Sequence, residues 1–207
     1  MDSILVTGAE GFVGRALGPA LKRAFPDARL IGTTRGGETL AGYDTAIRLD
    51  LTHGNVVDSL ATLRPGMVLH LAARSSVAQS HGMAHLTFGD NVLAALRLAE
   101  AMRSQLAGVP LVFASSGEVY GTAFRAGIAL DETAVPAPQN AYARSKLVGE
   151  FAFMDILASV SPVIALRLFN HFGPGQDERF VVPAFAAQVR AAMAGGTGEV
   201  LTGNLDA

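Results

Sequence analysis

Cysteine is absent from the 207-residue chain, which excludes disulfide bonds, thiolate metal sites and thiol catalysis. The 16 lysines and arginines form no run and the formal net charge is only −2, unlike the strongly basic surface typical of nucleic-acid binding. No apolar run is long enough to span a bilayer, and no basic segment precedes an apolar stretch at the N-terminus. We therefore expect a cytoplasmic protein that binds neither nucleic acid nor membrane.

The composition that remains is that of a packed globular protein. Half of the residues are hydrophobic and 16% are charged, so the chain can bury a sizeable core as one domain, or as one domain and part of a second. The 23 glycines belong to no low-complexity tract or internal repeat. This combination favours an α/β protein over a disordered chain.

Strand-like and helix-like segments alternate along the sequence. Apolar runs predict strands at 4–6, 29–34, 46–49, 67–71, 109–114 and 162–169, with the fifth of them fully buried. Helical spacing of apolar residues predicts helices at 12–25, 56–63, 85–106 and 140–159, the last with Asn140 as its N-cap. The alternation is typical of a doubly wound parallel sheet, in which ligands bind beyond the carboxyl ends of the strands.

The pattern changes after Phe169. The turn sequence at 173–175 interrupts it, and 180–193 has the periodicity of a helix outside the alternation. We therefore expect one α/β domain at 1–169, followed at 170–207 by the beginning of a second domain that is too short to be complete.

Three glycines at three-residue spacing follow the first predicted strand. Gly8 allows the sharp turn, Gly11 lets the backbone approach a ligand, and Gly14 lets the next helix pack close to the strand. A helix N-terminus of this kind offers backbone N–H groups and a favourable dipole to a pyrophosphate. The pattern predicts a dinucleotide site, and a glycine turn of purely structural origin is the alternative.

Tyr142 and Lys146 are four residues apart on a predicted helix, so both side chains project from one face. A neighbouring ammonium favours the phenolate form of tyrosine by charge attraction. Ser116, after a predicted strand, is placed to hydrogen-bond a substrate carbonyl oxygen beside that phenol. The set predicts acid–base catalysis, and the alternative is a surface tyrosine and lysine with a helix-capping serine.

Four motifs, in this order along the chain, resemble the signatures of extended short-chain dehydrogenases/reductases that act on nucleotide sugars. They are TGAEGFVG at 7–14, HLAA at 70–73, SSGEVYG at 115–121 and YARSK at 142–146. The match covers nearly the whole chain. It implies a Rossmann fold that binds a dinucleotide at 1–169, a nicotinamide cofactor and a nucleotide-sugar substrate.

Further stretches are similar to one branch of that family, the GDP-4-keto-6-deoxy-D-mannose reductases. They are RLFNHFGPGQ at 167–176, RFVVP at 179–183, HLAARSSV at 70–77 and GNLDA at 203–207. The resemblance implies reduction of the 4-keto group of a 4-keto-6-deoxy nucleotide sugar, with GDP-4-keto-6-deoxy-D-mannose giving GDP-D-rhamnose. Family members continue past the equivalent of Ala207, so the substrate-binding domain is expected to be incomplete.

The resemblance also assigns roles to individual residues. It implies a catalytic triad of Ser116, Tyr142 and Lys146, in which Tyr142 donates a proton to the sugar ketone and Lys146 also holds the nicotinamide ribose. The residues expected to bind the cofactor are Gly8, Gly11, Phe12, Val13, Gly14, Arg35, Asp50, Leu51, Leu71, Ala72, Ala73, Tyr142 and Lys146. The residues expected to bind the substrate are Ser75, Ser76, Glu118, Asn170 and Arg179. Ordinary loop or surface side chains are the alternative for Asp50, Glu118, Asn170 and Arg179.

Cofactor choice depends on the end of the second predicted strand. Residues 30–35 offer hydroxyls and Arg35 where an NAD-binding protein would place an acidic residue for the ribose diol. Arg35 suits a 2′-phosphate, so we expect NADP(H) to be preferred. An exposed arginine that leaves both NADP(H) and NAD(H) acceptable is the alternative.

Two other functions stay open. A nucleotide-sugar 4-epimerase or 4,6-dehydratase would carry tightly bound NAD, but dehydratases that resemble 115–121 place an acidic residue or serine where this chain has Gly117. A non-catalytic dinucleotide-binding module would keep the glycine turn and often lose the Tyr142 and Lys146 pair. Whether two subunits pair as a homodimer also stays open.

The five histidines predict no metal site. His81 and His85 are four residues apart but lack a third ligand at a recognisable spacing, and the other three are scattered. We expect all five to be structural or solvated.

Overall fold

The structure is a computed structural model that describes residues 2–53, 55–76, 82–195 and 198–203. In chain order its elements are β1 (Ser3–Thr7), α1 (Phe12–Ala24), β2 (Arg29–Thr34), β3 (Thr45–Arg48), α2 (Val56–Leu63), β4 (Met67–His70), α4 (Ala84–Gln105), β5 (Leu111–Ala114), the 3₁₀ turns η1 (Gly117–Val119) and η2 (Gly121–Ala126), α5 (Ala141–Leu157), β6 (Val163–Leu166) and α6 (Val181–Met193). Every predicted strand and helix is present, with ends a few residues from the predicted ones.

All six strands are parallel, and their order across the sheet is β3-β2-β1-β4-β5-β6. From β1 the chain adds β2 and then β3 on one side, and it then returns to place β4 on the other side of β1. The C-terminal ends of β1 and β4 therefore form the switch point at which sheets of this topology bind ligands. This order confirms the predicted doubly wound parallel sheet.

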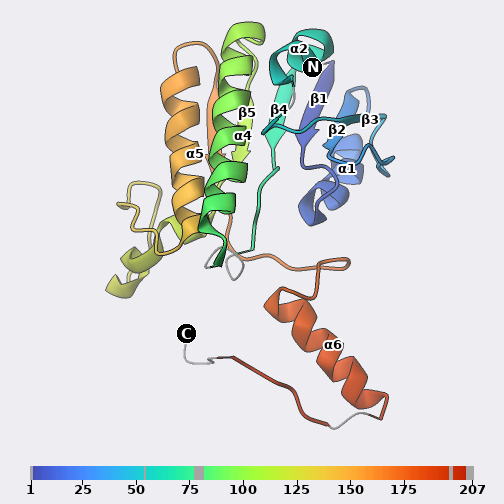
Figure 1. Cartoon of the computed structure of the whole chain (residues 1–207), viewed down its shortest axis with the longest axis vertical. Helices are drawn as coiled ribbons and strands as arrows, with labels where there is room; N and C mark the ends of the chain where they lie inside the picture. Colours follow the sequence, from blue (N-terminus) through green and yellow to red (C-terminus); the bar gives the residue numbers. More distant parts are fainter. Residues whose placement is uncertain (1, 54, 77–81, 196–197, 204–207) are drawn as a thin grey trace. The chain divides into compact units, whose positions relative to one another are not determined.

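Helices cover both faces of the sheet, and each face has its own hydrophobic core. On one face α2, α4 and α5 pack over the strands, and Leu60, Leu98 and Phe153 of these helices are fully buried. Figure 1 shows α4 and α5 side by side, and α4 also packs against α2. On the other face α1 packs over β1 and β2, with Leu21 against Ile4. These layers hold the C-terminal ends of the strands in fixed positions.

The prediction that β5 is fully buried was wrong, and β6 is even less covered. Burial alternates along β5, so Val112 and Ala114 are only half-buried. Ile164 and Leu166 of β6 are 51% and 41% exposed. The physical reason is the reach of α1, because the core beneath that helix contains residues of β1, β2 and β4 but none of β5 or β6.

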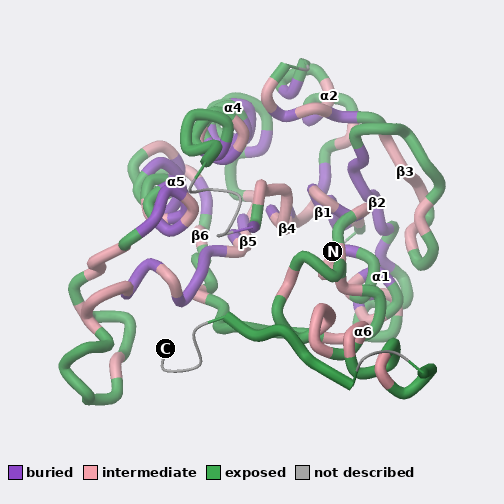
Figure 2. Tube along the Cα trace, turned by 60° about the horizontal axis from the view of Figure 1, so that its bottom comes forward, coloured by how far each residue is buried: buried purple, intermediate pink, exposed green. Residues whose placement is uncertain are grey.

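The chain divides into two compact units, Met1–Phe169 and Asn170–Ala207. The first contains the whole sheet, and the second contains α6, which has no buried residue. Among the described residues none after Ser161 is buried, as the lack of purple in that part of Figure 2 shows. The role of the second unit as the start of a substrate-binding domain stays a prediction. None of the described helices is long and apolar enough to cross a membrane.

Candidate active site

The glycine turn joins β1 to α1 at the C-terminal edge of the sheet. Gly8 has φ +70°, and a Cβ there would lie 2.7 Å from the Ala72 backbone, so both the turn and the close approach require glycine. A Cβ at Gly14 would lie 2.5 Å from the Gly8 carbonyl oxygen, which is the tight packing of helix on turn that the sequence predicted.

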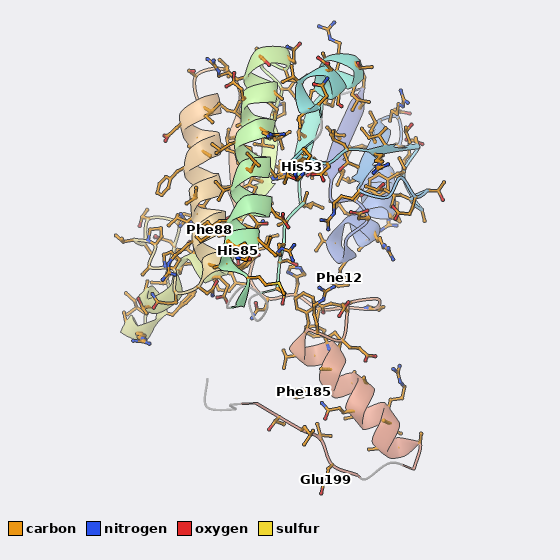
Figure 3. The ribbon with its side chains drawn as sticks, viewed as in Figure 1. Phe12, His53, His85, Phe88, Phe185 and Glu199 are labelled. Carbon is orange, nitrogen blue, oxygen red and sulfur yellow. The ribbon has the colours of Figure 1, made fainter. Side chains whose placement is uncertain are left out.

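The start of α1 fits a pyrophosphate group. Gly11 is the exposed N-cap and has no side chain that could cap the helix. The first turn, which begins with Phe12 (Figure 3) and Val13, contains no acidic residue. The positive end of the helix dipole is therefore not opposed by a carboxylate within the first turn, and a bound phosphate would be stabilised there.

The loop after β4 lies against the glycine turn. Leu71 donates its backbone N–H to the Thr7 carbonyl oxygen at 3.1 Å, and Ala72 donates to the Thr7 hydroxyl at 3.4 Å. Residues 71–73, which are predicted to bind cofactor, therefore lie beside Gly8 at the switch point of the sheet.

The end of β2 is held against the same turn. Gly8 donates its N–H to the Thr33 hydroxyl at 3.3 Å, and Ala9 donates to the Thr33 carbonyl oxygen at 3.2 Å. Arg35 follows β2, and its side chain is 74% exposed. Its backbone N–H donates to Glu10 Oε2 at 3.1 Å, and its Nε lies 3.8 Å from Glu10 Oε1. Arg35 thus lies where the adenosine ribose of a dinucleotide is expected, but with a carboxylate beside it.

Asp50 and Leu51 follow β3. The Asp50 carboxylate accepts hydrogen bonds from the Thr52 hydroxyl at 2.6 Å and from its N–H at 2.8 Å, and these hold the pKa of Asp50 below its ordinary value. Leu51 is buried in the core beneath α2 and α4. The carboxylate therefore stabilises its own loop, and contact of this pair with an adenine stays a prediction.

Ser116 and Tyr142 meet beyond the C-terminal end of β5. Ser116 is 7% exposed and caps η1 by accepting the Glu118 N–H at 3.2 Å. Its hydroxyl also lies near enough to the Tyr142 phenol to lower the pKa of that phenol. Asn140 caps α5, as predicted, with its Oδ1 accepting the Ala143 N–H at 2.8 Å, and this cap fixes the helix start that carries Tyr142. Ser116 therefore caps η1 and lies beside Tyr142, and its catalytic role stays a prediction.

Lys146 lies one helical turn after Tyr142 and is 4% exposed. Its Nζ donates to the Ala114 carbonyl oxygen at 2.7 Å and lies 4.9 Å from the centroid of the Phe113 ring. Burial lowers the pKa of Lys146 to about 8. An ammonium carries three N–H donors, so two are left for a ligand such as a ribose.

The expectation that Lys146 favours the phenolate of Tyr142 is wrong for this structure. Burial raises the pKa of Tyr142, the nearby Ser116 hydroxyl offsets part of that rise, and the charge of Glu118 adds to it. The Lys146 ammonium is directed to Ala114 and lies 5.9 Å from the centroid of the Tyr142 ring. Tyr142 is therefore protonated at neutral pH, which is the form that a general acid needs.

Glu118 shares this site. Asn140 donates from Nδ2 to Glu118 Oε2 at 3.2 Å, so the residue that caps α5 also orients the carboxylate. A Cβ at the preceding Gly117 would lie 3.4 Å from the Phe169 ring, an ordinary van der Waals contact. The structure does not demand glycine at 117, and the missing acidic side chain is a chemical difference from the dehydratase pattern.

The loop that carries Ser75 and Ser76 is tied to α5 by Asn91, which the sequence analysis did not single out. Ser75 is exposed and Ser76 is 6% exposed. Asn91 Oδ1 accepts the Arg74 N–H at 2.7 Å, and Asn91 Nδ2 donates to the Ser145 hydroxyl at 2.8 Å. An asparagine at a buried position of the helical period in α4 was the signal that could have revealed this link.

An ion pair between a buried glutamate and a partly buried arginine was also missed. Arg167 Nη2 lies 2.9 Å from Glu150 Oε2, and the two side chains are 17% and 9% exposed. Glu150 also accepts a hydrogen bond from the Ser115 hydroxyl, and the Arg167 guanidinium lies 4.9 Å from the centroid of the Tyr120 ring. This network joins α5 to the segment that carries Ser116 and so supports the position of that hydroxyl.

Asn170 and Arg179 belong to the second unit and are both exposed. Arg179 Nη2 lies 3.0 Å from Asp177 Oδ2, and the Arg179 N–H donates to Asp177 Oδ1 at 2.9 Å. These are contacts within one turn of the chain. Contact of Asn170 and Arg179 with a substrate diphosphate stays a prediction.

Four of the five histidines lie among the described residues. His53 lies in the turn that follows β3 and His85 lies in α4, and Figure 3 shows them well apart. No group of three or more potential ligands that could hold a metal occurs among the described residues. His81, like residues 204–207 of the predicted GNLDA motif, lies outside the described residues.

Comparison with known proteins adds two kinds of finding. The family model described as "NAD dependent epimerase/dehydratase family" matches residues 4–207. Among curated proteins, GDP-6-deoxy-D-mannose reductase of Pseudomonas aeruginosa is 30% identical over 187 residues, covering 90% of this chain and 58% of that protein. A UDP-glucose 4-epimerase of Mycolicibacterium smegmatis is 30% identical over 210 residues, covering 95% of this chain and 64% of that protein.

Solved structures show the same likeness. MoeE5 in complex with UDP-glucose and NAD superposes with a TM-score of 0.79 at 33% identity, over 93% of this chain and 62% of that one. RMD from Pseudomonas aeruginosa complexed with NADPH has a TM-score of 0.74 at 30% identity, over 94% and 63%. The chain thus spans about 60% of the length of the relatives that it matches.

Proposed function

The chain belongs to the NAD dependent epimerase/dehydratase family, and from that premise we propose that it is a reductase of a 4-keto-6-deoxy nucleotide sugar. The proposed reaction converts GDP-4-keto-6-deoxy-D-mannose to GDP-D-rhamnose. The observation that carries the proposal is the placement of Tyr142 one helical turn before the buried Lys146 on α5 and beside Ser116, in surroundings whose burial raises the pKa of the phenol. This set lies at the C-terminal edge of the sheet that also carries the glycine turn.

Each side chain has a distinct part in the proposed reaction. A reduced nicotinamide, when bound, supplies the hydride for the ketone carbon. Tyr142 donates its phenolic proton to the ketone oxygen, and Ser116 hydrogen-bonds that oxygen and keeps it beside the phenol. The ammonium of Lys146, which keeps two N–H donors besides its hydrogen bond to the Ala114 carbonyl oxygen, is proposed to hold the nicotinamide ribose.

The cofactor is proposed to be NADP(H) by preference, with NAD(H) accepted. Arg35 supports this, because its exposed guanidinium at the end of β2 suits a 2′-phosphate. The relatives support both cofactors, since MoeE5 was solved with NAD and RMD with NADPH. The remaining cofactor contacts are proposed for the glycine turn, Asp50 and Leu51, and residues 71–73.

The substrate is proposed to be a nucleotide sugar, with Ser75, Ser76, Glu118, Asn170 and Arg179 as its proposed contacts. Ser75, Ser76 and Glu118 belong to the unit that carries the catalytic residues, and Asn170 and Arg179 belong to the second unit. An amide and a guanidinium are natural partners of diphosphate oxygens. The name of the Pseudomonas aeruginosa relative supports a GDP-linked 6-deoxymannose as the sugar.

The direct test mixes the protein with NADPH and GDP-4-keto-6-deoxy-D-mannose and follows the absorbance of the reduced nicotinamide. We expect oxidation of NADPH that depends on the ketosugar, with a GDP-deoxyhexose as product by mass spectrometry. NADPH that stays reduced, in a preparation shown to bind it, would overturn the proposal.

A 4-epimerase is the second candidate, and the likeness to the UDP-glucose 4-epimerase of Mycolicibacterium smegmatis favours it. An epimerase returns its hydride to the same substrate, so the purified protein would retain NAD and interconvert UDP-glucose and UDP-galactose without net redox change. Analysis of nucleotide released from the denatured protein separates the two candidates. A 4,6-dehydratase is less well supported, because Gly117 stands where that chemistry would need a further acid.

A further inference from the structure

We propose that Glu10 determines cofactor specificity in this chain by opposing Arg35. Its carboxylate neutralises part of the Arg35 charge and places a negative group at the site proposed for the 2′-phosphate. The consequence is a protein that accepts NADH as well as NADPH, although β2 itself ends without an acidic residue. The inference rests on the proposed use of a nicotinamide dinucleotide.

The position of Glu10 is fixed by backbone contacts on both sides. The preceding Ala9 donates its N–H to the Thr33 carbonyl oxygen at 3.2 Å, which ties the glycine turn to β2. Glu10 Oε2 then accepts the backbone N–H of Arg35 at 3.1 Å. Only 29% of the Glu10 side chain is exposed, against 74% for Arg35. The carboxylate is therefore anchored, whereas the guanidinium is free to move.

The place of this carboxylate matters because of how such sheets bind a dinucleotide. An acidic residue about twenty residues beyond the glycine motif, near the end of β2, normally accepts the ribose hydroxyls of NAD and repels the phosphate of NADP. In this chain that position carries Thr33, Thr34 and Arg35. Glu10 brings a carboxylate to the same strand end from the glycine turn instead, within hydrogen-bonding distance of the Arg35 backbone.

The charges around the site decide how strongly Glu10 acts. Its contact with the Arg35 guanidinium is long, at 3.8 Å, and exposed, so the pair is weak and Arg35 can turn toward a phosphate. Asp50 also interacts electrostatically with Arg35, and Glu38 lies on the exposed loop that follows. Glu10 is the carboxylate of the three that is hydrogen-bonded to the end of β2. Replacing it should therefore change the local charge without moving the strand.

The test compares Glu10→Gln with the unchanged protein and with Asp27→Asn. Glutamine keeps an oxygen acceptor for the Arg35 N–H and removes only the charge. Asp27→Asn removes the same charge at the exposed turn before β2, at the opposite end of that strand. Dissociation constants of NADPH and NADH are measured by titration calorimetry, together with those of 2′,5′-ADP and 5′-AMP, which carry the ribose without the nicotinamide.

We expect Glu10→Gln to raise the preference for NADPH over NADH by about tenfold. The interaction energy between a charge near the protein surface and a nearby phosphate corresponds to a change of about this size in the dissociation constant. The preference for 2′,5′-ADP over 5′-AMP should rise in parallel, and Asp27→Asn should change neither. Both gains should shrink at high ionic strength, since exposed charges are screened.

Two results would overturn the proposal, and they differ from failure of the proposed function. Unchanged cofactor preference in Glu10→Gln, or an equal change in Asp27→Asn, rejects the role of Glu10 while leaving dinucleotide binding intact. If the unchanged protein binds neither NADPH nor NADH, the proposed function falls and the role of Glu10 falls with it.

Discussion

β1 and β6 are strands of one sheet, yet they differ almost completely in burial. Ile4, Leu5 and Val6 of β1 are 0% exposed, whereas Ile164 and Leu166 of β6 are 51% and 41% exposed. β1 lies between two partner strands with a hydrophobic core on each face, while β6 is at the edge of the sheet and pairs with β5. The middle of the sheet is therefore buried, whereas its β6 edge is exposed.

The difference in burial separates the two proposed functions of the protein, cofactor binding and substrate binding. The glycine turn and its neighbours lie over the buried strands, and their positions are fixed by packing and backbone hydrogen bonds. The residues after β6 include large exposed apolar side chains such as Phe172 and Met193, at 70% and 85%. Exposed apolar surface on this scale is typical of a face that another segment or partner covers. We call the buried part of the sheet, with the helices and loops that pack on it, the packed side. Cofactor binding should depend on the packed side alone, and substrate binding should also need contacts from a covering segment or partner.

The largest expected effect tests whether catalysis belongs to the packed side. Tyr142→Phe removes the proton donor but keeps the ring, so turnover of the ketosugar should fall by about 10²–10⁴-fold, the usual loss for a general acid. Binding of NADPH and the unfolding transition should stay close to those of the unchanged protein. Quenched assays with product analysis measure turnover, and calorimetry measures NADPH binding and unfolding. Equal activity in the variant would remove Tyr142 from the mechanism.

The same change from isoleucine to alanine, made once in β1 and once in β6, compares the two strands directly. Ile4→Ala should lower the free energy of unfolding by about 2–5 kcal/mol, because it leaves a cavity in a closed core. Ile164→Ala should change it by no more than about 0.5 kcal/mol, as expected for a surface position. Urea unfolding followed by circular dichroism gives both values. Similar losses would show that β6 is covered in solution.

Acid should destabilise the packed side through His70. This residue is 1% exposed, its Nδ1 is hydrogen-bonded to the Thr7 hydroxyl at 2.7 Å, and burial lowers its pKa to about 3. The unfolded chain binds the proton below about pH 6.5 and the folded chain does not, so stability is complete above pH 6.5 and is lost as the pH falls toward 3. At pH 5 the loss relative to pH 8 should be about 2 kcal/mol.

Unfolding experiments between pH 5 and 8 measure this loss. His70→Gln should weaken the pH dependence of the free energy of unfolding. The same slope in His70→Gln as in the unchanged protein would assign the acid sensitivity to other groups.

The smallest expected effect uses two glycines in helices. Gly14→Ala places a Cβ 2.5 Å from the Gly8 carbonyl oxygen and should cost about 1–3 kcal/mol of stability along with cofactor affinity. Gly89→Ala, in α4, meets nothing within 4 Å and should stabilise the helix by about 0.5–1 kcal/mol. Thermal unfolding without NADPH measures the stability of each variant, and the shift that NADPH causes measures its cofactor affinity. A neutral Gly14→Ala would show that the turn can relax away from the strand.

The elements that the sequence predicted best are those whose signals are local. Asn140 is a polar N-cap after a proline-rich loop, and it caps α5 as expected. The spacing of Tyr142 and Lys146 placed both on one helix, and the structure holds both beside β5. The direction of the Tyr142 pKa was missed, because it depends on how deeply the ring is buried and on the Ala114 carbonyl that binds Lys146.

The amino-acid sequence by itself determined the alternation of strands and helices, the glycine turn and the order of the four motifs, since periodicity and turn chemistry act over a few residues. Only the tertiary structure decided which charges meet. Glu10 and Arg35 are twenty-five residues apart, and Asn91 and Ser145 are fifty-four apart. The first pair forms because the parallel strands β1 and β2 bring their C-terminal ends to one edge of the sheet, and the second because α4 packs against α5. No spacing along the chain predicts either contact.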